Sequence, residues 1–109
     1  MSKVVIKSHL GEVLSELNSR VPVILEALGI EAEGNAVTEI TELGAVDTGR
    51  LRGSISHAHD DTSAYIGTNV EYGQYIELGT SKMAARPFLR NAITNYTDDY
   101  KHIIEEGLK

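Results

Sequence analysis

The chain has 109 residues, of which 41% are hydrophobic and 24% charged, and its formal net charge is −6. This length lies near the commonest size of a single domain, so we expect one domain over residues 1–109. An acidic chain lacks the extended basic surface that nucleic-acid binding requires, and we expect no sequence-specific nucleic-acid binding. A local basic patch facing an acidic partner is still expected from Arg50, Arg52, Lys82, Arg86 and Arg90.

The sequence contains no cysteine, so it has neither a disulfide framework nor a thiolate site, which is consistent with a reducing cytosol. Its apolar runs are only a few residues long, and the N-terminus lacks the charged, apolar and cleavable regions of a signal peptide. We therefore expect neither a signal peptide nor a membrane span.

The N-terminal part predicts a short strand followed by two helices. Residues 3–7 are β-branched and flanked by lysines, as in an edge strand. A first helix would begin at Ser8 and end near residues 18–20, because Pro22 is disfavoured in a helix interior. Residues 21–43 predict a long amphipathic helix, since their apolar side chains recur with a period near 3.6.

The central part predicts a turn, a β-hairpin and a short helix. Asp47-Thr48-Gly49 is typical of a turn or of the start of a brief helical turn. Residues 53–68 alternate as in two strands, joined at Asp60-Asp61. The spacing of Tyr72, Tyr75, Ile76 and Gly79 then predicts a short helix.

The C-terminal part predicts one final helix, which would begin at Pro87 and end at Gly107. Its buried side would consist of Phe88, Leu89, Ala92, Ile93, Tyr96, Tyr100, Ile103 and Ile104. Together these elements predict an α+β fold. In this fold a small antiparallel sheet with a β-hairpin packs against a long N-terminal helix and a C-terminal helix.

A histidine pair on the expected hairpin raises the question of a metal site. His57 and His59 would point to the same side of a strand, and Asp60 follows directly. Imidazole and carboxylate groups are common zinc ligands, so a small metal-dependent enzyme using these three residues is one alternative interpretation. The sequence places no further ligand beside them, and paired histidines on a hairpin are commonly solvated. We therefore expect no metal and no cofactor.

The tripeptide Asp47-Thr48-Gly49 also occurs at the catalytic carboxylate of aspartic proteases. Those enzymes need a second carboxylate to share the proton, which a homodimer would supply. Here Arg50-Leu51-Arg52 follows, in place of the apolar and small residues found in the proteases. We expect Asp47 to accept backbone hydrogen bonds that start a turn. We expect no catalytic residues, and the protein not to be an enzyme.

Basic side chains gather near the start of the expected final helix. Lys82, Arg86 and Arg90 would either hold an anion there or form solvated and intersubunit salt bridges, and we favour the second interpretation.

Aromatic side chains in the same region suggest a contact surface. We expect at least one of Tyr72 and Tyr75 to be a core or half-core residue. The other, with Met83 and Phe88, would anchor an interface, because aromatic, methionine and arginine side chains are enriched at protein contacts.

These motifs together give the chain a specific resemblance. The string VDTGRLRGSI, a hairpin, and then YIGTNVEYGQYIELGTSKMAARPFLRNAI resemble the gene-ten-like tail-component family of tailed bacteriophages and prophages. The matching positions lie between residues 46 and 89, and they are Val46, Asp47, Thr48, Gly49, Leu51, Ser54, Ile55, Gly67, Thr68, Tyr72, Tyr75, Glu77, Gly79, Thr80, Arg86, Pro87, Phe88 and Leu89. Gln74 departs from the family pattern, which often has proline there.

The resemblance implies a virion structural protein of the neck, acting in head–tail joining or tail completion. Such proteins form rings around the DNA channel, so the implied partners are copies of this chain and neighbouring phage head-completion and tail proteins. DNA would pass through the lumen, no membrane would be involved, and the protein would occur in the virion and in the host cytoplasm during assembly. A soluble regulatory binding module is a further alternative. The residues expected at subunit interfaces are Asp47, Thr48, Gly49, Arg50, Tyr72, Tyr75, Glu77, Gly79, Thr80, Lys82, Met83, Arg86, Pro87 and Phe88.

Overall fold

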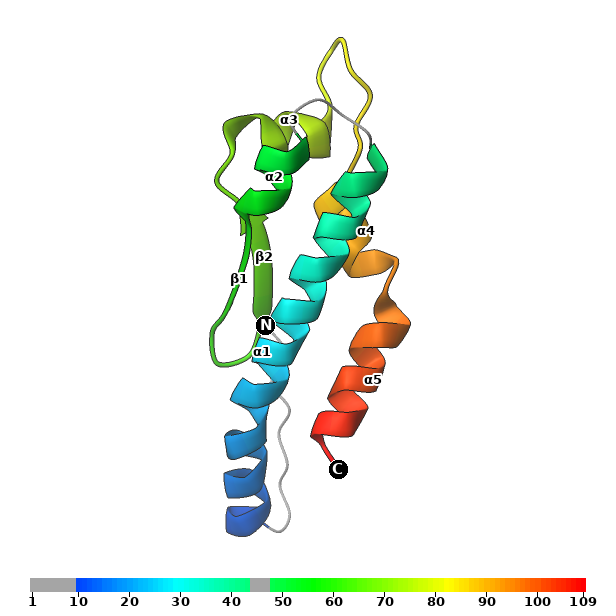
Figure 1. The fold of residues 1–109 in the computed structure, drawn as a ribbon. Helices are drawn as coiled ribbons and strands as arrows, with labels where there is room; N and C mark the ends of the chain where they lie inside the picture. The colour runs from blue at the N-terminus through cyan, green and yellow to red at the C-terminus, as the bar shows by residue number, and fades with distance from the viewer. Residues whose placement is uncertain (1–9, 44–47) are drawn as a thin grey trace.

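The computed structural model describes residues 10–43 and 48–109 of the chain (Figure 1). Its elements are α1 (Leu10–Leu43), α2 (Thr48–Ser54), β1 (Ile55–His59), β2 (Ala64–Thr68), α3 (Glu71–Leu78), α4 (Phe88–Thr94) and α5 (Thr97–Gly107). The predicted α+β fold is confirmed, with a two-stranded antiparallel hairpin, a long N-terminal helix and C-terminal helices. The strand predicted at residues 3–7 and the cap at Ser8 lie outside the described residues.

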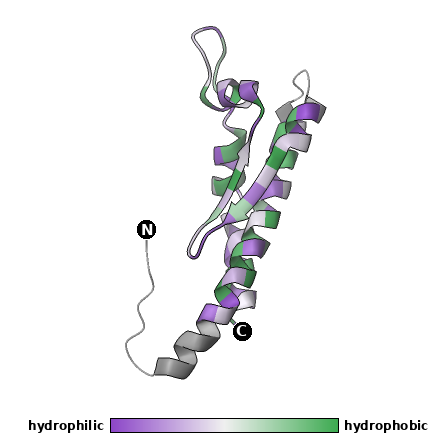
Figure 2. Cartoon of the chain, turned by 90° about the vertical axis from the view of Figure 1, so that its left-hand side faces the viewer, coloured by the Kyte–Doolittle hydropathy of each residue, from purple (hydrophilic) through white to green (hydrophobic). Residues whose placement is uncertain are grey.

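α1 is a single helix of 34 residues that runs along the length of the molecule (Figure 1). Along the coloured part of α1, hydrophilic and hydrophobic residues are interspersed, as in an amphipathic helix (Figure 2). Among residues 18–42 of α1, the buried apolar residues are Ile24, Leu25, Ala32, Ala36 and Ile40. The amphipathic helix predicted for residues 21–43 is therefore confirmed.

The helix break predicted near residues 18–20 is wrong, because α1 continues through Pro22. Proline in a helix interior removes one backbone hydrogen bond and costs about 3 kcal/mol, but the bonds on either side remain. Pro22 is exposed, and the residues that follow it, Ile24 and Leu25, are buried. Packing directly after the proline thus holds the chain in the helix against the local preference.

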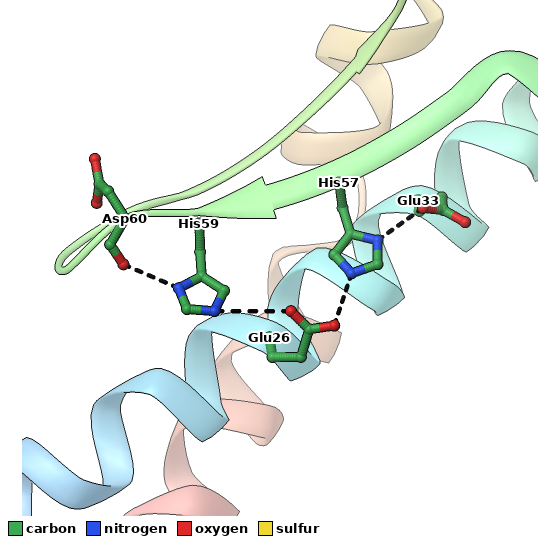
Figure 3. Close-up of polar contacts among 5 residues, drawn as sticks. All are labelled: Glu26, Glu33, His57, His59 and Asp60. Carbon is green, nitrogen blue, oxygen red and sulfur yellow. Dashed lines mark hydrogen bonds and ion pairs between the residues drawn. The ribbon is translucent and has the colours of Figure 1, made fainter.

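β1 and β2 form the predicted hairpin and pack against α1. In the antiparallel register His57 lies opposite Ile66, and His59 lies opposite Ala64. Since residues two apart share one face of a strand, both histidines point toward α1 (Figure 3).

The Asp60 carboxylate closes the turn between the two strands. Its Oδ2 accepts a hydrogen bond from the Tyr65 hydroxyl at 2.6 Å, and its Oδ1 accepts from the backbone N–H groups of Thr62 at 2.8 Å and Ser63 at 2.7 Å. These donors, the tyrosine hydroxyl first, stabilise the charged form and lower the pKa of Asp60 to about 2. Asp60 is therefore a structural residue of the turn.

The single final helix predicted from Pro87 to Gly107 is wrong, because α4 and α5 are separated at Asn95-Tyr96. The Tyr96 backbone is not helical, with φ −127° and ψ 29°, and its hydroxyl donates to Glu39 Oε2 at 2.8 Å. This contact raises the pKa of Tyr96 to about 12. The break lets α5 turn and follow α1, which one straight helix would not do.

The change of direction also alters which side chains are buried. Tyr100 accepts a hydrogen bond from the buried Asn35 amide at 3.0 Å and donates to the Ala92 carbonyl. Ile93 and Ile104, both predicted on the buried side, are 46% and 40% exposed. The helical period therefore identified the apolar positions of this segment, but it did not predict which of them are buried.

The main core lies where the C-terminal half of α1 meets α2, the hairpin, α3 and α4. Its buried members are Ala36, Ile40, Leu51, Ile55, Val70, Phe88 and Ala92. The molecule measures 56 × 22 × 22 Å, and its radius of gyration is 16.7 Å, against about 13 Å for a compact domain of this length. It is therefore elongated. No helix within residues 10–43 and 48–109 has both the length and the apolar character to cross a membrane.

Candidate interaction surface

α3 follows β2 directly and gives its two tyrosines different environments. The N–H of Val70, the residue before α3, donates to Thr68 Oγ1 at 3.1 Å, and Gly73 is so close to Thr68 that a Cβ there would lie 2.8 Å from its Cγ2. On this tightly packed helix Tyr72 packs against the core, whereas Tyr75 is 48% exposed. The prediction that at least one of these tyrosines is a core or half-core residue is confirmed.

α3 ends at Gly79, whose backbone has φ 80° and ψ 171°. This conformation is essentially restricted to glycine, and a Cβ here would lie 2.7 Å from the backbone nitrogen of Ala85. The Gly79 N–H donates to the Tyr75 carbonyl at 2.8 Å, and the Arg86 N–H donates to the Ile76 carbonyl at 2.7 Å. Both ends of the following loop are therefore fixed to the last turn of α3.

The loop of residues 80–86, called the 80–86 loop below, projects beyond α3 at one end of the molecule (Figure 1). All of its residues are exposed. Thr80 and Met83 exchange backbone hydrogen bonds of 2.8 and 3.3 Å, and the Lys82 N–H donates to Thr80 Oγ1 at 3.2 Å. The loop is thus an internally bonded turn that presents its side chains outward.

Glu77 connects α3 to the start of α4. Its Oε1 accepts a hydrogen bond from the Leu89 N–H at 2.7 Å, and its Oε2 accepts from the Arg90 N–H at 3.1 Å. Such N–H groups at a helix start lack intrahelical partners and favour an anion. The position considered for an external anion beside Lys82, Arg86 and Arg90 is therefore occupied by the protein's own carboxylate.

The predicted interface residues divide by exposure. Those exposed are Gly49, Arg50, Tyr75, Thr80, Lys82, Met83 and Arg86, and those partly buried are Tyr72, Glu77, Gly79 and Pro87. Phe88 is 1% exposed and belongs to the main core, so the structure removes it from the surface anchors. Asp47 lies outside the described residues, and Thr48 is the first residue of α2.

Two features of this surface were not predicted. Leu78 is 75% exposed beside Gly79, and the Arg50 guanidinium lies 5.9 Å from the centre of the Tyr72 ring. Leu78 does not share the helical face of Tyr72 and Gly79. This position off the shared face is the signal in the sequence that could have identified an apolar residue facing solvent. Next to it lies an open groove of about 440 Å³, lined by residues 67–71, Gly73, Gln74, Glu77, Leu78 and Leu89.

The histidine pair contacts α1 instead of assembling with Asp60 (Figure 3). His57 Nδ1 lies 2.7 Å from Glu33 Oε1, and His57 Nε2 lies 2.9 Å from Glu26 Oε2. His59 Nε2 lies 3.7 Å from Glu26 Oε1, and its Nδ1 lies 2.9 Å from the backbone carbonyl of Asp60. Sequence reasoning missed both glutamates because they lie 24 and 31 residues from His57. Within the described part of the chain, no group of three or more His, Cys, Asp or Glu residues could hold a metal ion.

Comparison with known proteins adds no relative. No protein-family model, curated protein or solved structure matches this chain. A function is therefore inferred below from the surface and from the motifs that form it.

Proposed function

We propose that this protein is a structural subunit of a phage or prophage virion, which acts at the neck in head–tail joining or tail completion. The observation that carries the proposal is the 80–86 loop, which is exposed throughout, bonded internally and fixed at both ends to α3. This loop belongs to the motif through which the chain resembles the gene-ten-like tail-component family. A projecting loop with its own hydrogen bonds suits a subunit that works by assembly.

The side chains around the loop support a role in protein contacts. Tyr75, Leu78 and Met83 are 48%, 75% and 39% exposed, and Lys82 and Arg86 of the 80–86 loop are exposed as well. Aromatic, methionine and arginine side chains are enriched at interfaces, and exposed apolar groups gathered together mark contact sites. The elongated shape leaves much surface for neighbouring subunits to cover.

The proposed partners are copies of this chain in a ring, together with neighbouring head-completion and tail proteins. DNA would pass through the ring without sequence-specific contacts, because a net charge of −6 repels phosphates instead of binding them. The site of action is the virion, after assembly in the host cytoplasm. The role requires neither a cofactor nor catalysis.

Removal of the loop side chains in a phage that encodes this chain tests the proposal. We expect Lys82→Ala with Met83→Ala to give folded protein, because both side chains are exposed in the loop. Heads and tails should then accumulate unjoined, as counted by negative-stain electron microscopy, and the plaque titre should fall sharply. Circular dichroism melting of the purified variant checks the fold.

The matched control is Lys101→Ala with Leu108→Ala, which removes one charge and one apolar group from exposed positions on and just after α5. This variant should leave particle joining unchanged. If the loop variant gave joined, infectious particles at normal titre, this result would contradict the proposal. Genes for portal, capsid and tail-tube proteins beside this one would favour it over a regulatory binding module.

A further inference from the structure

His57 is the centre of a polar link between the hairpin and α1 (Figure 3). Glu33 contacts its Nδ1 at 2.7 Å, and Glu26 contacts its Nε2 at 2.9 Å. The His57 side chain is 21% exposed, while those of Glu26 and Glu33 are 50% and 37% exposed. The link therefore lies at the rim of the packed region, where solvent protons reach it.

This geometry requires a particular protonation state. A neutral imidazole carries one N–H and one lone pair, whereas the imidazolium carries two N–H groups, and an ionised carboxylate only accepts hydrogen bonds. Two carboxylates on the two ring nitrogens are both satisfied only when His57 is protonated. Loss of the proton would leave Glu26 or Glu33 facing a lone pair.

The surroundings of His57 leave these two glutamates as its charge partners. Beneath the ring α1 carries Gly29, where a Cβ would lie 2.8 Å from His57 Cδ2. Across the sheet, β2 places the apolar Ile66 opposite His57. From β1, His59 is the other titratable group beside the cluster, and it faces Glu26 at 3.7 Å.

We propose that protonated His57 is a latch that holds the β1–β2 hairpin on α1, so that the hairpin is held most firmly at mildly acidic pH and loosens as the pH rises. The latch acts within one chain, and it does not depend on the function proposed above.

The direction of each pKa shift gives the pH range of the latch. Hydrogen bonds to Glu33 and Glu26 raise the pKa of His57 above its ordinary 6.5, so its stabilising effect is complete below 6.5 and is lost as pH rises through the folded value. The hydrogen bond from His57 lowers the pKa of Glu26 below 4.5, so its effect is complete above 4.5 and is lost at lower pH. The latch is therefore fully formed between these two ordinary values.

Nuclear magnetic resonance on the full chain tests the latch in a buffer that contains a chelator. The ring-proton titration of His57 should have a midpoint above 6.5, whereas His57→Gln should lack this titration. Protection factors of the β1 amides should fall between about pH 6 and pH 9 in the wild type, by roughly 1.5- to 5-fold as for other exposed ion pairs. His57→Gln should abolish this fall, because glutamine carries no titrating group.

His102→Gln is the matched control, since this histidine is exposed on α5. It should keep the wild-type pH dependence of β1 protection. A His57 midpoint at or below 6.5, or an unchanged fall in the His57→Gln protein, would overturn the latch. In a separate titration without the chelator, stoichiometric binding of added Zn²⁺ by the wild type, but not by His57→Gln, would also overturn the latch, because it would assign the cluster to a metal.

Discussion

Gly29 is buried under the imidazole of His57, on the side of α1 that faces β1. A Cβ at this position would lie 2.8 Å from Cδ2 and 3.1 Å from Cγ of His57. Gly34, in the same helix, is exposed, and apart from its chain neighbours and the adjacent helix backbone nothing lies within 4 Å of the corresponding point. Two glycines with the same cost to the helix therefore have different surroundings, and only Gly29 makes room for another side chain.

We expect Gly34→Ala to stabilise the protein by about 1 kcal/mol, because alanine is the better helix former and open space receives its methyl group. At Gly29 the same substitution displaces the His57 ring. The free energy of unfolding of Gly29→Ala should therefore rise clearly less than that of Gly34→Ala, or it should fall. Urea denaturation of both variants at about pH 6 compares them. Equal gains at the two positions would show that the ring is not held against α1.

At the scale of elements, α3 and α4 are joined by one carboxylate at a helix start. Glu77 accepts from the Leu89 and Arg90 N–H groups at 2.7 and 3.1 Å, which holds the two helices together on either side of the 80–86 loop. The cap comes from a residue that lies 12 positions before Leu89, the residue whose N–H it accepts. Local capping rules, which examine only the few residues that flank a helix, would not find it.

Glu77→Gln should lower the free energy of unfolding by about 0.5–2 kcal/mol, the usual range for a helix cap, because an amide offers one acceptor oxygen in place of two. Glu105→Gln, which removes the same charge at an exposed position on α5, should change it by no more than about 0.5 kcal/mol. Chemical denaturation of the three proteins gives both values. Equal effects of the two substitutions would argue against the cap.

The sequence predicted those elements that local patterns determine and missed the contacts between distant residues. The hairpin and the short tyrosine helix follow from alternation and helical spacing, and the structure confirms both. The continuation of α1 through Pro22 depends on packing, and the break at Tyr96 on a contact with Glu39, 57 residues away. The glutamates bound to His57 have the same long-range origin, since nothing near the hairpin in the sequence specifies them.

At the scale of the whole molecule, the largest fully buried side chains gather toward the end that carries the 80–86 loop. Phe88, Ile40 and Leu51 are the largest of these. Away from this end, α1 and α5 approach each other closely, and Gly107 packs against the Ile24 side chain. Stability should therefore depend mainly on the end from which the proposed contact loop projects.

Phe88→Ala should destabilise the protein by about 3–5 kcal/mol, as expected when a fully buried aromatic ring is removed. Met83→Ala, five positions earlier on the exposed loop, should change the free energy of unfolding by no more than about 0.5 kcal/mol. Thermal and urea denaturation distinguish the two effects. A small effect of Phe88→Ala would contradict its assignment to the core.

Because the 80–86 loop is closed at its base, its length can change without a change in the rest of the fold. The Gly79 and Arg86 N–H groups bond to neighbouring carbonyls of α3, so the two ends of the loop stay together whatever lies between them. The entropy cost of a loop closed in this way grows only slowly with its length. Related chains would therefore be free to lengthen or shorten the loop to fit different partners, while Phe88 keeps its place in the core.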